Sequence, residues 1–179
     1  SPKEALDAVK NNTLDLVSYP HSAGFETYRE GLAKYYQGIN INVTAADINI
    51  TTGGSEALQI ALAVTCNPDD EVIVMEPFYT NYNSFALQND VKLVPVPTTI
   101  ESGFALPDIS EFEKYITPKT KGIIVCNPGN PTGSLYTKES IIRLGEIAKK
   151  HDIFLYSDEV YREFCYTDEP HFSAMHVPG

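Results

Sequence analysis

The regular alternation of short apolar runs with helical stretches is the feature that most constrains how this chain can fold. Five β-rich runs are strand candidates, at residues 48–51, 71–75, 91–96, 122–126 and 153–157. Four helix candidates lie between them, at residues 55–66, 80–89, 109–116 and 137–151, and two more lie upstream, at residues 1–12 and 25–38. The strands are too apolar to face water, and strands that alternate with helices are typical of parallel sheets. We therefore expect an α/β fold, with a mainly parallel sheet and helices on both faces.

Composition excludes several classes of function. Of 179 residues, 42% are hydrophobic, which is enough to bury one substantial core without disulfides or metals. Thirteen Lys and Arg against 24 Asp and Glu give a net charge of -11, whereas nucleic acids and anionic membranes both favour basic surfaces. No apolar run approaches the length of a membrane span. We therefore expect a small-molecule enzyme that binds neither nucleic acid nor membrane.

The cysteines give no sign of a disulfide or a metal site. Cys66, Cys126 and Cys165 are odd in number and far apart, and the sequence has no CxxC pair or Cys/His cluster. Such spacing supports neither a disulfide framework nor a zinc site. We expect three reduced thiols, no bound metal and a cytoplasmic protein.

Two strand ends carry glycines or an aromatic residue. Ligands of open parallel sheets bind beyond the carboxyl ends of the strands. In "TTGGSEAL" (51–58), two glycines precede a helix and leave free N–H groups that suit a phosphate. A tight turn capped by Ser55 explains the same residues equally well. In "EPFYTNY" (76–82), Pro77 ends the strand, and Tyr79 either stacks on a planar ligand or belongs to the core.

The other two strand ends carry amides and carboxylates. "NPGNPTG" (127–133) contains two Asn-Pro pairs, which force an extended backbone and give a stiff loop that can fix an Asn amide. "SDEVYREF" (157–164) places Asp158 at the end of a buried strand, where a carboxylate is costly unless a cation or several donors meet it. Arg162 is expected to pair with Glu159 on the surface. For Asp158, a positively charged ligand is the better partner.

Taken together, these four motifs resemble the large domain of the class I/II aminotransferases, the aspartate aminotransferase-like branch of the fold-type I pyridoxal-phosphate enzymes. The segment "SYPHSAGFETYREGLAKYY" (18–36) lies in the matching upstream place. The resemblance implies that residues 1–179 form most of the cofactor-binding large domain. It also implies a homodimeric enzyme that uses pyridoxal 5′-phosphate to transfer an amino group between an amino acid and a 2-keto acid, with aspartate as the suspected donor.

The resemblance assigns roles around the cofactor ring to four side chains. Asp158 is expected to pair with the protonated pyridine nitrogen, which makes the ring an electron sink. Asn130 and Tyr161 are expected to donate hydrogen bonds to the phenolic oxygen of the cofactor. Tyr79 is expected to stack on the face of the ring.

Four further residues are expected to bind the phosphate of the cofactor. Gly54, Ser55 and Glu56 would offer their backbone N–H groups from the start of a helix. Tyr19 would reach the same phosphate from the neighbouring subunit, which is the basis for expecting a homodimer.

The resemblance also makes predictions about the backbone. The Glu76-Pro77 and Asn130-Pro131 peptide bonds are expected to be cis. The strands that begin near residues 71, 91, 122 and 153 are expected to form one continuous parallel sheet. The candidate strand at 48–51 does not pair with these four in the family.

One part of the family pattern is missing from these residues. Family members bind the cofactor as an imine through a lysine in a Ser-x-x-Lys segment, and no such segment occurs here. Lys149 and Lys150 read as charges at a helix end. We expect the imine lysine and the small domain to lie beyond Gly179, and this chain alone to be inactive.

Two alternative functions remain open at this point. A cysteine-sulfur lyase of the same fold would carry the same motifs and use the same cofactor. A non-catalytic module, which binds pyridoxal phosphate or another anion or serves dimerisation, would explain the missing lysine.

Overall fold

The computed structural model describes residues 1–178, and their contacts divide the chain into two compact units, Ser1–Ile50 and Thr51–Gly179. The first unit contains helices α1 (Lys3–Lys10) and α2 (Glu26–Gly38) and the 3-10 turn η1 (Ala45–Asp47). The Arg29 guanidinium of α2 donates to the carbonyl oxygens of Gly24 at 3.3 Å and Ala45 at 2.7 Å. These bonds fasten the segments before and after α2 to the helix itself.

The second unit is built on a four-stranded sheet. Its strands are β1 (Glu71–Glu76), β2 (Lys92–Pro97), β3 (Thr120–Cys126) and β4 (Phe154–Asp158), and they lie in the order β2-β1-β3-β4. Every pair of neighbours is parallel. The predictions of a mainly parallel sheet and of one continuous sheet from these four strands are confirmed.

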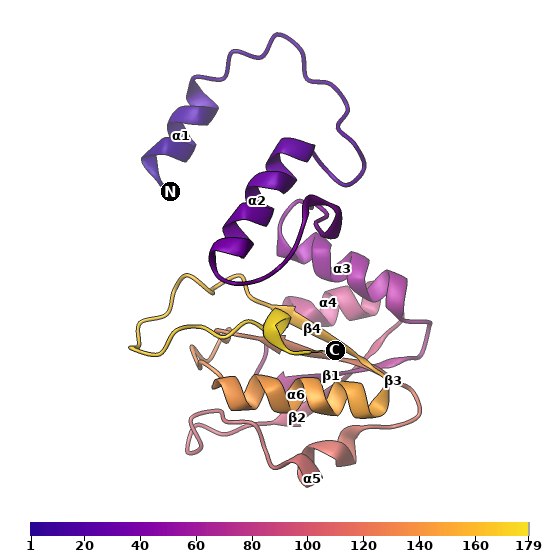
Figure 1. The fold of residues 1–179 in the computed structure, drawn as a ribbon. Helices are drawn as coiled ribbons and strands as arrows, with labels where there is room; N and C mark the ends of the chain where they lie inside the picture. The colour runs from indigo at the N-terminus through magenta and orange to yellow at the C-terminus, as the bar shows by residue number, and fades with distance from the viewer. Residues whose placement is uncertain (179) are drawn as a thin grey trace. The chain divides into compact units, whose positions relative to one another are not determined.

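Helices cover both faces of this sheet, as Figure 1 shows. The helical elements are α3 (Gly54–Thr65), α4 (Asn81–Gln88), α5 (Ile109–Phe112), α6 (Lys138–His151) and the short turns η2 (Glu113–Tyr115) and η3 (Ala174–His176). Because side chains alternate along a strand, β1 buries residues in two layers. Val72 and Val74 pack with α3 and α4, whereas Ile73 and Met75 pack with α5 and α6. The predicted α/β architecture is therefore present.

The ends of α6 follow from its sequence. The Thr137 side chain accepts a hydrogen bond from Ser140 N–H and so caps the first turn. At the other end, Asp152 adopts a left-handed conformation, and Lys149 and Lys150 lie in the last turn as expected. Lys150 also pairs with Glu113 at 2.7 Å. The α6 lysines thus stabilise a helix end at the amino edge of the sheet, where β4 begins.

Residues 48–51, a strand candidate in the sequence, do not form a strand. The chain is extended at Ile48, yet the sheet that the structure describes contains no strand from these residues. A strand needs a neighbour that satisfies its backbone groups, and the Ile50 N–H instead donates to the Ala23 carbonyl at 3.0 Å. The expectation that these residues do not pair with the other four strands is confirmed, and without a neighbouring strand they form no strand.

Membrane-spanning helices and metal-binding clusters are both absent from residues 1–178. Across these residues no helix combines the length and the apolar character that crossing a bilayer requires. The same residues hold no group of His, Cys, Asp and Glu side chains arranged to bind a metal ion. Cys66, Cys126 and Cys165 are all free thiols.

Candidate active site

An open cavity lies beyond the carboxyl ends of the strands, with about 550 Å³ of empty space. Its wall is shared by the start of α3, the region before and within α4, the loop after β3 and the end of β4. Six of the eight residues predicted from the sequence line it: Gly54, Ser55, Tyr79, Asn130, Asp158 and Tyr161. Residues far apart in the chain are therefore brought to one place.

The start of α3 forms one end of the cavity. Gly53 precedes the helix with a φ of +88°, a conformation that L side chains rarely adopt. A Cβ on Gly54 would lie 3.1 Å from Val160 Cγ1. The first intrahelical bond runs from Ala57 N–H to Gly53 O, so the N–H groups of residues 54–56 remain available.

Two details of the α3 start correct or refine the sequence reading. Ser55 lies inside the helix and does not cap it, because Gly53 occupies the capping position. Glu56 does not line the cavity. Its carboxylate turns back to accept the N–H of Thr52, which leaves only the Glu56 backbone in the first turn of α3.

Asp158 is the half-buried carboxylate in the cavity wall. Its Oδ2 accepts a hydrogen bond from the Tyr82 hydroxyl at 2.7 Å, and its Oδ1 accepts one from Val160 N–H at 3.3 Å. Within residues 1–178, no Lys, Arg or His forms an ion pair with it. A carboxylate with two donors and no cation, facing an open cavity, is suited to receive a positively charged ligand.

The neighbouring carboxylate, Glu159, has a structural environment instead. Its Oε1 accepts hydrogen bonds from Ser157 Oγ, Ser173 Oγ and Ala174 N–H at 2.8–3.0 Å. The expected pair with Arg162 is present at 3.7 Å, but it is mostly buried rather than on the surface. Glu159 therefore fastens the returning segment near 173 to the end of β4, which is why the pair is covered.

The loop after β3 holds Asn130 in the cavity wall. Asn127, which is buried, donates its N–H to the Asp158 carbonyl and accepts the Tyr136 N–H on its side-chain oxygen, both at 2.9 Å. The Asn130-Pro131 bond is cis, as predicted, and so is Asn127-Pro128. The loop is thus joined to β4 at one end and to the segment before α6 at the other.

Two tyrosines complete the predicted set within the second unit. The Tyr79 hydroxyl accepts a hydrogen bond from Asn81 Nδ2 at 2.7 Å, and the preceding Glu76-Pro77 bond is cis as predicted. Tyr161 is 41% exposed and has its ring edge against Phe164. Both side chains line the cavity.

Sequence reasoning missed two polar residues of the cavity, Tyr82 and Cys126. Burial raises the pKa of the Tyr82 phenol, and the nearby Cys126 and Asp158 raise it further. Burial, followed by the charge of Asp158, also raises the pKa of the Cys126 thiol. Both groups are therefore protonated near neutral pH. No sequence signal marks either residue: Tyr82 lies in the first turn of α4, and Cys126 ends β3.

Tyr19 is the eighth predicted residue and belongs to the first unit. It is fully exposed there, and so are its apolar neighbours Leu14, Leu16 and Val17, each more than 70% exposed. No charged or apolar partner within the first unit covers this stretch.

Comparison with known proteins gives a consistent result. The family model described as "Aminotransferase class I and II" matches residues 2–178. The chain is 38% identical over 165 residues to a putative aminotransferase, YugH, of Bacillus subtilis, covering 90% of this chain and 42% of that protein. It is 38% identical over 160 residues to the aspartate/prephenate aminotransferase of Thermus thermophilus, covering 89% and 41%.

Solved structures agree with the sequence matches. The aspartate aminotransferase from Thermus thermophilus with maleate superposes with a TM-score of 0.85 at 35% identity, covering 98% of this chain and 44% of that one. An aminotransferase from Escherichia coli gives a TM-score of 0.89 at 33% identity, covering 97% and 43%. The chain thus spans less than half the length of these relatives. Its fold and its sequence both place it in one family: it belongs to the class I and II aminotransferases.

Proposed function

We propose that the protein is a pyridoxal-phosphate-dependent aminotransferase that transfers an amino group between an amino acid and a 2-keto acid. The observation that carries this proposal is Asp158, a half-buried carboxylate without a cation, facing the same cavity as the open start of α3. A cation-seeking group at one end and anion-seeking N–H groups at the other match the two ends of this cofactor. Family membership supports the proposal.

The residues present fit the cofactor. A Cβ on Gly54 would lie 3.1 Å from Val160 Cγ1, a tight contact, so a glycine suits the crowded start of α3 where the phosphate would bind. Among the described residues Asp158 has donors but no ion pair, which leaves its charge for the ligand. Tyr79 lines the same cavity. When bound, the cofactor supplies an electron sink for the carbanion formed at the substrate Cα.

The residues of the chain would act on the cofactor by binding and orientation. Asp158 would hold the proton on the pyridine nitrogen, which needs an ionised carboxylate at that position. Asn130 and Tyr161 would donate hydrogen bonds to the phenolic oxygen. Tyr79 would cover one face of the ring and exclude water from it.

The phosphate would be held at the start of α3. The backbone N–H groups of Gly54, Ser55 and Glu56 precede the first intrahelical bond and are aligned with the positive end of the helix dipole. The Glu56 carboxylate is turned away onto Thr52, which keeps its negative charge out of the cavity wall.

Aspartate is the suspected amino donor, and the printed names of the relatives define the panel to test. They include aspartate/prephenate, glutamate-pyruvate and aromatic-amino-acid aminotransferases. Purified protein at its full encoded length should convert the cofactor to its amine form with at least one of these amino acids and return it with a 2-keto acid. Aspartate is expected to react fastest.

The same assay separates the alternatives. A cysteine-sulfur lyase would release sulfide from a cysteine conjugate and need no keto acid. A non-catalytic module would bind the cofactor without turnover of any amino acid. Either result would replace the transfer reaction as the function.

We further propose that the enzyme is a homodimer in which Tyr19 serves the site of the neighbouring subunit. The exposure of Tyr19, together with the uncovered Leu14, Leu16 and Val17, supports a partner for this stretch. The prediction is tested with mixed dimers of a Tyr19→Phe subunit and an Asp158→Ala subunit, assayed at limiting cofactor. One site of each mixed dimer would then combine an intact Asp158 with an intact Tyr19.

If Tyr19 acts on the partner, each mixed dimer should have about half of the wild-type activity, because one of its two sites is complete, and a random equal mixture about a quarter, because half of its dimers are mixed. If Tyr19 acts within its own subunit, each site in the mixed dimer carries one defect and mixing restores nothing. Mixtures in which subunits cannot exchange provide the control.

A further inference from the structure

Tyr82 is a buried tyrosine in the cavity wall with contacts on two sides. It is 1% exposed and lies in the first turn of α4, where its N–H donates to the Tyr79 carbonyl at 3.0 Å. Its hydroxyl donates to Asp158 Oδ2 at 2.7 Å, across 76 residues of sequence. Its ring meets the Tyr79 ring edge to face, with centroids 5.5 Å apart. One side chain therefore touches both Asp158 and Tyr79.

We propose that Tyr82 is a positioning residue that orients Asp158 and Tyr79 toward the cofactor, an inference that rests on the proposed function. With Oδ2 held by the Tyr82 hydroxyl and Oδ1 bonded to Val160 N–H, the carboxylate has a fixed orientation. The edge-to-face contact fixes the plane of Tyr79 in the same way. Tyr82 would thus orient both the carboxylate that meets the pyridine nitrogen and the tyrosine that covers the face of the cofactor ring.

The surroundings of Tyr82 hold it in place for this role. Its ring also stacks on Phe78 at 6.3 Å and contacts Phe85 at 6.5 Å, within the apolar layer that includes Leu62 and Ile124. Because burial raises its pKa, the phenol stays protonated and remains a donor throughout the neutral range. A donor that does not titrate stabilises the ionised carboxylate at every working pH.

Three other titratable side chains line the cavity with Asp158 and Tyr82: Cys126, Tyr79 and Tyr161. Cys126 approaches from β3, and burial raises the pKa of its thiol, which bonds to the Pro128 carbonyl instead. Within residues 1–178, the Tyr82 hydroxyl is the one side-chain donor to the Asp158 carboxylate.

The test is the pH dependence of cofactor affinity in the protein at its full encoded length. The probe is 4-deoxypyridoxine 5′-phosphate, which keeps the pyridine nitrogen and phosphate but has no aldehyde. In Tyr82→Phe, affinity at pH 8 should fall about five-fold, because Asp158 loses the hydrogen bond that holds its carboxylate in the orientation for the pyridine nitrogen. A carboxylate that loses a donor takes up a proton more easily, so the acid side of the binding profile should move up by about one pH unit.

Two further variants separate orientation from general stability. Tyr156→Phe also removes a tyrosine hydroxyl, which is partly buried and bonded to Thr65 at 2.5 Å beside the same apolar layer, but Tyr156 does not line the cavity. Its binding profile should match that of the wild type. Tyr82→Leu removes the ring contact with Tyr79 as well, and should weaken binding further at all pH values without another shift of the acid side.

The outcomes distinguish this inference from the proposed function. A wild-type protein that fails to bind the probe overturns the cofactor site and the role of Tyr82 with it. A wild-type protein that binds, together with a Tyr82→Phe profile whose acid side is unmoved, overturns the role of Tyr82 alone. An equal shift in Tyr156→Phe would likewise assign the effect to general destabilisation and overturn it.

Discussion

Replacement of Asp158 by alanine should lower the kcat of the full-length enzyme at least ~100-fold, the usual cost of removing one well-placed electrostatic group. The carboxylate faces the cavity without a cation partner among the described residues. Its proposed task is to keep the pyridine nitrogen protonated, and alanine leaves that nitrogen largely unprotonated and the electron sink weak. Asp158→Glu keeps a carboxylate and should retain part of the activity. The measurement is kcat at saturating cofactor and substrate.

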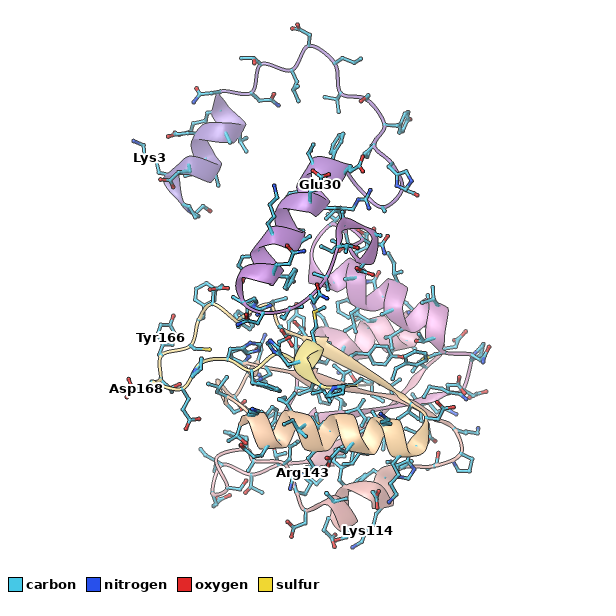
Figure 2. The ribbon with its side chains drawn as sticks, in the orientation of Figure 1. Lys3, Glu30, Lys114, Arg143, Tyr166 and Asp168 are labelled. Atoms are coloured by element: carbon cyan, nitrogen blue, oxygen red, sulfur yellow. The ribbon has the colours of Figure 1, made fainter. Side chains whose placement is uncertain are left out.

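The matched control is Asp168→Ala. Asp168 is an exposed carboxylate in the loop that follows β4, and Figure 2 shows it near Tyr166 at the outer end of that loop. Its removal should leave kcat unchanged. Asp158→Ala also leaves the Tyr82 hydroxyl without its acceptor, which costs about 1 kcal/mol of stability, so melting curves must show that the variant is folded. Near-normal turnover in a folded Asp158→Ala protein would refute the assigned role.

The strands could be predicted because burial on two faces leaves a strong local signal. In β1, alternate residues enter opposite apolar layers, so the strand reads as an unbroken apolar run. The sequence of β2 even indicates its place in the sheet. Pro95 and Pro97 cannot donate to a ladder, and β2 lies at an edge, with Pro95 exposed.

Pairing could not be predicted from local pattern. Residues 48–51 have the composition of a strand, but a strand forms only where a neighbour supplies hydrogen bonds. The boundary between the two compact units, at Ile50, could not be predicted for the same reason, because it depends on contacts between residues distant in sequence.

The site residues show the same distinction between what local sequence predicts and what depends on long-range packing. Asp158 and Asn130 were identified because each follows a strand, and parallel strands bring their carboxyl ends to one edge. Tyr82 was missed because it occupies an apolar helix position and its hydroxyl meets Asp158 only through the packing of α4 on the sheet. A residue that acts by positioning other site residues need not belong to a sequence motif.

Gly122→Ala should lower the free energy of unfolding by about 3 kcal/mol, at the upper end of the usual cost of overpacking. A Cβ at Gly122 would lie 2.3 Å from Tyr156 Cε2 and 3.0 Å from the Phe154 carbonyl oxygen. The Tyr156 ring cannot easily move away, because its hydroxyl is bonded to Thr65 and its face is stacked on Phe154. The backbone contact adds to the cost, since β3 and β4 are paired at this point. Urea denaturation, followed by circular dichroism, measures the change.

Two comparisons test whether the Tyr156 ring is the obstacle. Gly31→Ala places a methyl group in the interior of α2, where nothing lies within 4 Å, and should be neutral or stabilising by about 0.5–1 kcal/mol. Tyr156→Val destabilises the protein by itself, but it also removes the ring that meets the new methyl group. The double variant Gly122→Ala, Tyr156→Val should therefore lose less stability than the sum of the two single changes. A strictly additive double variant would show that the ring yields without cost, and that Gly122 is required by the β4 backbone rather than by Tyr156.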